Sequence, residues 1–68
     1  MQEEALNISI RKFLKMVGVN SQREIEHAVS SAIDRGDIEG AETLPVSMTL
    51  EIAGLNLKVQ FEGNIGLK

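Results

Sequence analysis

The side chains that could carry out acid–base or metal chemistry are few and scattered in this sequence. His27 is the only histidine, and the chain contains no cysteine. Glu24 and Glu26 are two residues apart on an expected helix, so their carboxylates do not face each other. One histidine without cysteine does not make a zinc site, and no nucleophile is spaced to pair with it. The sequence therefore predicts no enzyme activity, no metal and no cofactor.

Basic side chains are the second group that could do chemistry, because they hold anions. Arg11, Lys12 and Lys15 form the one basic cluster. The candidate contacts to an anion or a nucleic acid are Arg11, Lys15, Arg23 and Lys58. The net charge of −3 argues against a general affinity for nucleic acid or an anionic membrane. A solvated helix face is the simpler interpretation of the cluster.

A candidate protein interface lies on the expected first helix. Ile8 falls nearly opposite the main apolar side of that helix, close to Ala5, Lys12 and Met16. A single exposed isoleucine is ordinary in soluble proteins. Together these four residues form a candidate interface with a partner, and the sequence leaves both interpretations open.

Two amphipathic helices, at residues 3–17 and 21–35, are expected to position these side chains. Apolar residues recur at helical spacing in both segments. Gly18 is of the type that ends a helix in a left-handed conformation. Ser21 and Glu24 have the spacing of a capping box at the start of the next helix.

Two strands are expected at residues 46–52 and 55–62, where apolar and polar residues alternate. A turn at Ala53-Gly54 would pair Ile52 with Leu55 and Val46 with Phe61, so that apolar residues face apolar residues. The turn type and the extent of the second strand beyond Glu62 stay open. The predicted fold is α+β, in the order ααββ, with both helices packed on the hairpin.

The length of 68 residues predicts one small domain, residues 1–68. Chains of this size bury little surface and often need a disulfide, a metal or a partner. Without cysteine, self-association is the remaining stabiliser. No apolar run is long enough to cross a membrane, and the acidic N-terminus is unlike a secretory signal, so we expect a cytoplasmic protein without membrane contact.

The segment SIRKFLKMVGVNSQREIEHAV and the later ETLP-x-x-MTL resemble a family of short bacterial proteins of unknown function. The likeness covers nearly the whole chain. It implies a bacterial source, and it brings no activity, ligand or catalytic residue.

These features favour a small, non-catalytic protein–protein interaction module. It would be a homodimer, formed through a strand edge by β-augmentation or through the surface around Ile8. The alternative is a nucleic-acid-associated helix-turn-helix or winged-helix protein, with the turn at Gly18 and the hairpin as a wing. The acidic residues of the expected second helix argue against that alternative.

Overall fold

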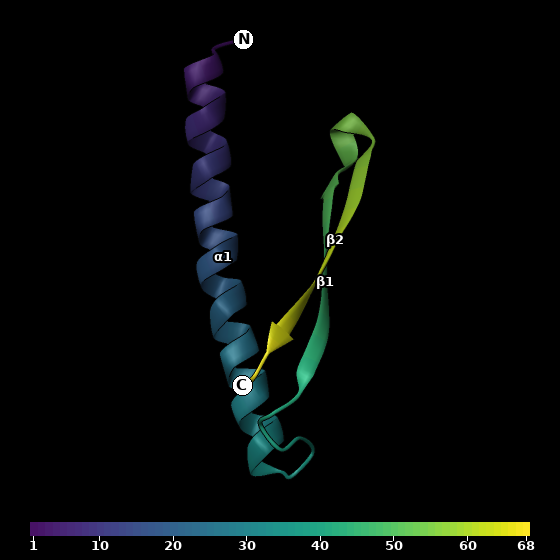
Figure 1. The fold of residues 1–68 in the computed structure, drawn as a ribbon. Helices are drawn as coiled ribbons and strands as arrows, with labels where there is room; N and C mark the ends of the chain where they lie inside the picture. Colours follow the sequence, from purple (N-terminus) through teal and green to yellow (C-terminus); the bar gives the residue numbers. More distant parts are fainter. The chain divides into compact units, whose positions relative to one another are not determined.

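The computed structural model describes residues 1–68 and contains one helix followed by a two-stranded antiparallel hairpin (Figure 1). The elements are α1 (Glu3–Asp34), β1 (Thr43–Ile52), a 3-10 turn (Ala53–Leu55) and β2 (Leu57–Gly66). The chain divides into two compact units, Met1–Arg35 and Gly36–Lys68, and each is described by itself. The α+β class is confirmed, and the single domain over residues 1–68 stays a prediction.

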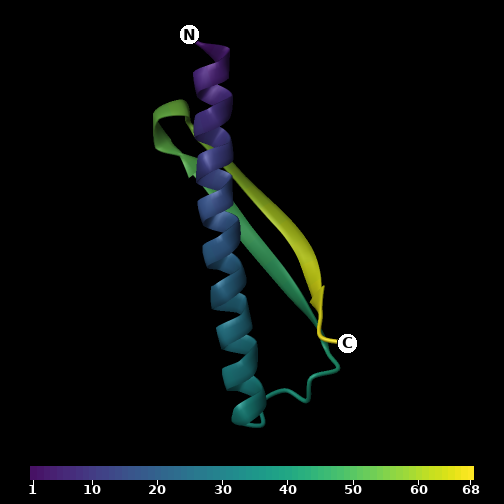
Figure 2. The same ribbon diagram turned by 90° about the vertical axis from the view of Figure 1, so that its left-hand side faces the viewer.

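The prediction of two helices, at residues 3–17 and 21–35, is wrong, and so is the order ααββ. α1 is one unbroken helix, as Figure 2 shows, and Gly18 lies inside it. Gly18 does not take a left-handed conformation, and Ser21 lies inside the helix instead of capping one. The physical reason is that glycine inside a helix costs only about 1 kcal/mol relative to alanine. The apolar spacing continues from Val17 to Ile25, so one continuous helix keeps these apolar residues on a single face.

Of the two predicted helix ends, the one at Gly18 is absent, and the one after residue 35 lies at Gly36. Gly36 has a φ of 78°, in the left-handed region, and directly follows the last turn of α1. The Arg35 N–H donates to the carbonyl oxygen of Ser31 at 3.0 Å. At the other end, Glu3 and Glu4 lie in the first turn, where negative charge complements the helix dipole.

The predicted strand pairing is wrong by two residues, although the predicted faces are correct. Ile52 pairs with Leu57, and Met48 pairs with Phe61. A shift of two residues keeps every side chain on the same face, because side chains alternate with a period of two. The loop is therefore longer than the expected Ala-Gly turn. It ends at Asn56, whose φ of 53° is a conformation that asparagine tolerates better than most residues.

Both strands are longer than the predicted ranges 46–52 and 55–62. β1 begins at Thr43, and β2 continues past Glu62 to Gly66. Pairing at the open end of the hairpin extends one step further, since the Leu67 N–H donates to the carbonyl oxygen of Glu42 at 2.9 Å.

The loop before β1 is organised by one carboxylate. The N–H groups of Glu39 and Gly40 each donate to the Glu42 carboxylate at 2.8 Å, and the Ala41 N–H donates at 3.0 Å. These donors favour the charged form, so the hydrogen bonds from Glu39 and then Gly40 lower the pKa of Glu42 below its ordinary 4.5. Because Glu42 also begins the pairing with Leu67, its side chain fixes the loop at the place where the hairpin starts.

We predict that this loop loses its order in acid. A lowered folded-state pKa means that the carboxylate stabilises the loop above pH 4.5 and that this contribution disappears as the pH falls through the folded value. The amide NMR shifts of Glu39 and Gly40 should therefore titrate together with a midpoint below 4.5. Glu42→Gln should abolish that step. A midpoint at or above 4.5, or an unchanged step in the variant, would contradict the assignment.

Candidate interaction surfaces

One apolar stripe follows almost the whole length of α1. Its positions repeat every eleven residues, so that Leu6, Val17 and Ala28 are equivalent, as are Leu14 and Ile25. An eleven-residue repeat has about 3.67 residues per turn, which suits helices that pack with a slight right-handed supercoil. We call the full set the α1 stripe: Leu6, Ile10, Leu14, Val17, Ser21, Ile25, Ala28 and Ala32. A helix end at Gly18, as predicted, would divide this repeat and hide it.

The two halves of the α1 stripe differ in side-chain size. Large side chains occupy the N-terminal half, where Leu14 is 57% exposed and Leu6 and Ile10 are also exposed. The C-terminal half contains one large side chain, Ile25, and otherwise the small residues Ser21, Ala28 and Ala32. The stripe is therefore broad at one end and flat at the other.

The structure brings the candidate interface residues together on α1. Ala5, Ile8, Lys12 and Met16 follow one another at intervals of three or four residues, so they share one face, roughly opposite the α1 stripe. Ile8 is 60% exposed, and Met16 is exposed as well. Val19 belongs to the same face, and the sequence analysis missed it because it placed Val19 after a helix end. We call these five residues the Ile8 surface.

The four candidate anion contacts do not form one cluster. Arg11 and Lys15 lie one turn apart on α1, and Arg23 lies two turns further along, on the side of the Ile8 surface. Lys58 belongs to the other unit, where it is the cross-strand neighbour of Glu51. Of the four candidate anion contacts, the structure therefore brings only Arg11 and Lys15 close together.

Charge is divided along α1. Residues 5–23 contain four basic side chains and no acidic one: Arg11, Lys12, Lys15 and Arg23. Residues 24–34 contain Glu24, Glu26 and Asp34 and no lysine or arginine. After an acidic first turn at Glu3 and Glu4, α1 thus presents a positive stretch followed by a negative C-terminal stretch.

The hairpin has one apolar face and two open edges. Its apolar face includes the pairs Leu50–Val59 and Met48–Phe61, and Phe61 is 58% exposed. Along a strand of an antiparallel pair, successive residues point their backbone N–H and C=O alternately toward the partner strand and away from it. Glu42 accepts a hydrogen bond from Leu67, so its backbone groups point toward the partner strand. Pro45 is three residues further on, and its backbone nitrogen therefore points away from β2. Proline has no N–H to donate, so the outer edge of β1 is interrupted there.

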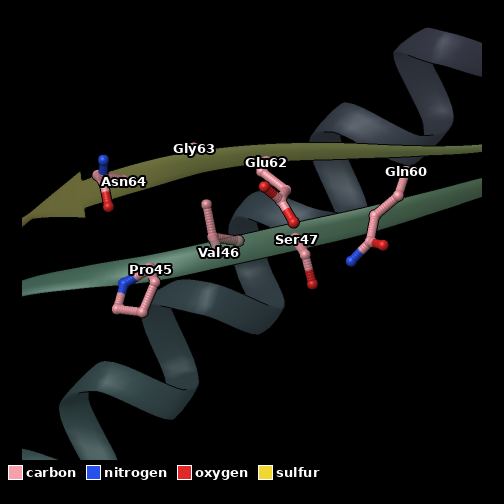
Figure 3. A pocket seen from close by; sticks show the side chains of 7 residues that line it. All are labelled: Pro45, Val46, Ser47, Gln60, Glu62, Gly63 and Asn64. Carbon is pink, nitrogen blue, oxygen red and sulfur yellow. The ribbon is translucent and has the colours of Figure 1, made fainter.

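A shallow, open depression lies on the hairpin, mainly in the half of its paired region nearer the open end (Figure 3). Its lining residues are Pro45, Val46, Ser47, Gln60, Glu62, Gly63 and Asn64. Gly63 is paired with Val46, and its lack of a side chain leaves the space beside Val46 open. A Cβ at Gly63 would fill that space, at 3.8 Å from the Val46 Cγ1 atom. The depression offers hydroxyl, amide and carboxylate groups, and it contains neither a basic side chain nor a histidine.

His27, Glu24 and Glu26 all lie on α1. The structure contains no group of three or more histidine, cysteine, aspartate or glutamate side chains arranged to hold a metal ion. No helix of this chain has the length and apolar character needed to span a bilayer.

Comparison with known proteins gives one match. A family model described as "Family of unknown function (DUF6494)" matches residues 1–68. No curated protein and no solved structure matches the chain. The match agrees with the resemblance to an uncharacterised family of small proteins.

Proposed function

Because the chain belongs to a family of unknown function, DUF6494, along residues 1–68, we propose a function from its own surfaces. It is a small, non-catalytic protein–protein interaction module that self-associates through the α1 stripe. A cytoplasmic, bacterial setting is part of this proposal, and the lack of cysteine fits a reducing compartment.

The observation that carries the proposal is the length and continuity of the α1 stripe. Seven of its eight positions are apolar, and three of its four largest side chains, Leu6, Ile10 and Leu14, are exposed. Fully burying a leucine or isoleucine side chain contributes about 1.5–3 kcal/mol. Apolar patches of this extent on soluble proteins are typical of interaction sites. Covering the stripe therefore gives a large gain in free energy.

The partner that fits best is a second copy of the same chain. Residues 5–23 of α1 are positive and residues 24–34 are negative. A second copy carries the opposite charge to each stretch and can steer the encounter at a distance, although Lys12 and Arg23 lie on the side of α1 away from the stripe. Homodimers with two-fold symmetry are also the commonest assemblies of soluble proteins.

Two other surfaces support the proposal less well. The edge of β1 is interrupted by Pro45, which lacks the donor that β-augmentation needs. The Ile8 surface is shorter than the α1 stripe and has Lys12 at its centre. Removing that charge from water would oppose the gain from Ile8 and Met16.

The nucleic-acid alternative is not proposed in its helix-turn-helix or winged-helix form. That motif needs two helices joined by a turn at Gly18, and α1 is continuous there.

Thermal unfolding at several chain concentrations tests the proposal. Self-association makes the unfolding midpoint rise with concentration, over about a hundredfold dilution series, because only the folded state binds a second copy. The rise should persist at high salt, since salt strengthens apolar burial while it screens surface charges. A midpoint that is independent of concentration at both salt levels would refute self-association.

A further inference from the structure

We propose that the free edge of β2 pairs antiparallel with β2 of a second copy, centred on Gln60, so that the two hairpins form one continuous sheet. This inference rests on the proposed function. A short strand pairing is only marginally stable in water by itself, and self-association through α1 holds two hairpins at high local concentration. The inference adds a second contact between the copies and their alignment along it.

The outer edge of β2 offers an unbroken row of backbone donors and acceptors. Leu67 is hydrogen-bonded to Glu42, so the even-numbered residues of β2 point their N–H and C=O groups away from β1. These residues are Lys58, Gln60, Glu62, Asn64 and Gly66. None of them is proline, so each has an N–H to donate. In the paired sheet β1 forms both outer edges, where Pro45 opposes the addition of further strands.

A two-fold axis through Gln60 matches both the backbone groups and the charges of two β2 strands. Gln60 of one copy then faces Gln60 of the other, and both point their backbone groups outward, so they form a hydrogen-bonded pair. Lys58 of each copy faces Glu62 of the other in the same way, with both side chains on the polar face. Opposite charges directly across an antiparallel pair stabilise it, and the symmetry forms this contact twice.

The apolar face of the hairpin suits the same alignment. Phe61 is 58% exposed in the single chain and faces Val59 of the other copy, and an aromatic residue opposite a β-branched one is a favourable strand pair. Leu57 faces Gly63, which has no side chain to crowd it. A two-fold axis perpendicular to the sheet keeps the apolar faces of both hairpins on the same side.

The neighbouring alignments fit less well. An axis through Glu62 sets that carboxylate opposite its own copy, and like charges directly opposite destabilise a strand pair. An axis through Phe61 sets Lys58 opposite Asn64. It also sets Glu62 opposite Gln60, so no opposite charges face each other directly.

Amide hydrogen exchange of the full-length chain, measured residue by residue by NMR under conditions of self-association, tests the pairing. The N–H groups of Lys58, Gln60 and Glu62 become hydrogen-bonded in the paired sheet. They should exchange at least about tenfold more slowly than the N–H of Thr49, which points outward from β1. Gly66 should exchange quickly as well, because it lies level with the loop of the other copy and not with its strand.

Gln60→Pro removes the central outward donor and leaves the hydrogen bonds between β2 and β1 in place. The exchange of Lys58 and Glu62 should then become as fast as that of outward N–H groups on β1. Thr49→Pro is the matched control, because Thr49 is the cross-strand neighbour of Gln60 and loses an outward donor from the other edge. It should leave Lys58 and Glu62 slow.

An exchange of charges tests the alignment. Lys58→Glu and Glu62→Lys each set like charges opposite each other in a pair of identical chains, so each variant alone should lose the slow exchange at Gln60. An equimolar mixture of the two variants sets opposite charges against each other at both contacts. The mixture should therefore restore slow exchange at Gln60, and a mixture that does not restore it would overturn the alignment.

The pattern of exchange separates the possible failures. Fast exchange at Lys58, Gln60 and Glu62, in chains that sediment as dimers, would overturn the β2 pairing and leave self-association through the α1 stripe standing. Slow exchange at Asn64 and Gly66 as well would overturn the alignment on Gln60. Monomeric chains with fast exchange at all these positions would overturn both the pairing and the proposed function.

Discussion

Leu14→Glu is expected to convert the self-associated chain into a monomer. Leu14 lies on the α1 stripe and is 57% exposed in the single chain. The substitution removes a leucine from each side of a two-fold interface, at about 1.5–3 kcal/mol per buried side chain, and it places a carboxylate in apolar surroundings. Because one leucine is lost from each of the two copies, the association should be at least about a hundredfold weaker. Glutamate is a good helix former, so α1 itself should persist.

The same substitution at Ile8 is the matched control for this effect. Ile8 is 60% exposed and lies on the opposite side of α1. Ile8→Glu should therefore leave the assembly unchanged. Size-exclusion chromatography and far-ultraviolet circular dichroism of both variants measure assembly and helix content. If Ile8→Glu gives the monomer and Leu14→Glu does not, the Ile8 surface is the interface and the α1 stripe is not.

Gly18→Ala is expected to stabilise the protein, and Gly36→Ala is expected to destabilise it. A Cβ at Gly18 meets no atom within 4 Å, and alanine in a helix interior is favoured over glycine by about 1 kcal/mol. Gly36 has a φ of 78°, where a side chain costs about 1–2 kcal/mol. A change of 1 kcal/mol moves the thermal midpoint of a chain this size by about 4–8 °C.

The sign of the Gly18 effect distinguishes one continuous helix from two helices. If Gly18 ended a helix in a left-handed conformation, alanine there would lower the midpoint as it does at Gly36. Thermal unfolding of the two variants beside the natural chain measures both effects in one experiment. A lower midpoint for Gly18→Ala would contradict the continuous α1.

The helix was predictable from the sequence in extent but not in continuity. Apolar spacing and the acidic first turn placed its start at residue 3, where α1 begins. Gly18 is compatible with both a helix end and a helix interior, and the predicted helix end rested only on its freedom to adopt a left-handed conformation. The information that decides for continuity is the eleven-residue repeat that relates Leu6 to Val17 and Ala28.

The hairpin shows which of its features the local alternation of apolar and polar residues determines. Alternation fixed the faces, so that Met48 and Phe61 lie on the apolar face as predicted. It could not separate two pairings that differ by two residues, because both put apolar against apolar. The loop decided the pairing, through the left-handed Asn56.

The candidate surfaces were predictable to the extent that they depended on helical spacing alone. Ala5, Ile8, Lys12 and Met16 share a face because their spacing is helical in any model of residues 3–17. Val19 was missed because that face continues beyond the residue where the predicted helix stopped. The division of charge along α1 also became visible as one feature only when residues 3–34 formed a single helix.

The native mass of the natural chain, measured by sedimentation equilibrium over a dilution series at low and high salt, tests self-association most directly. We predict the mass of two chains at high concentration, with dissociation towards one chain on dilution, at both salt levels. The mass of a single chain at every concentration would contradict the account.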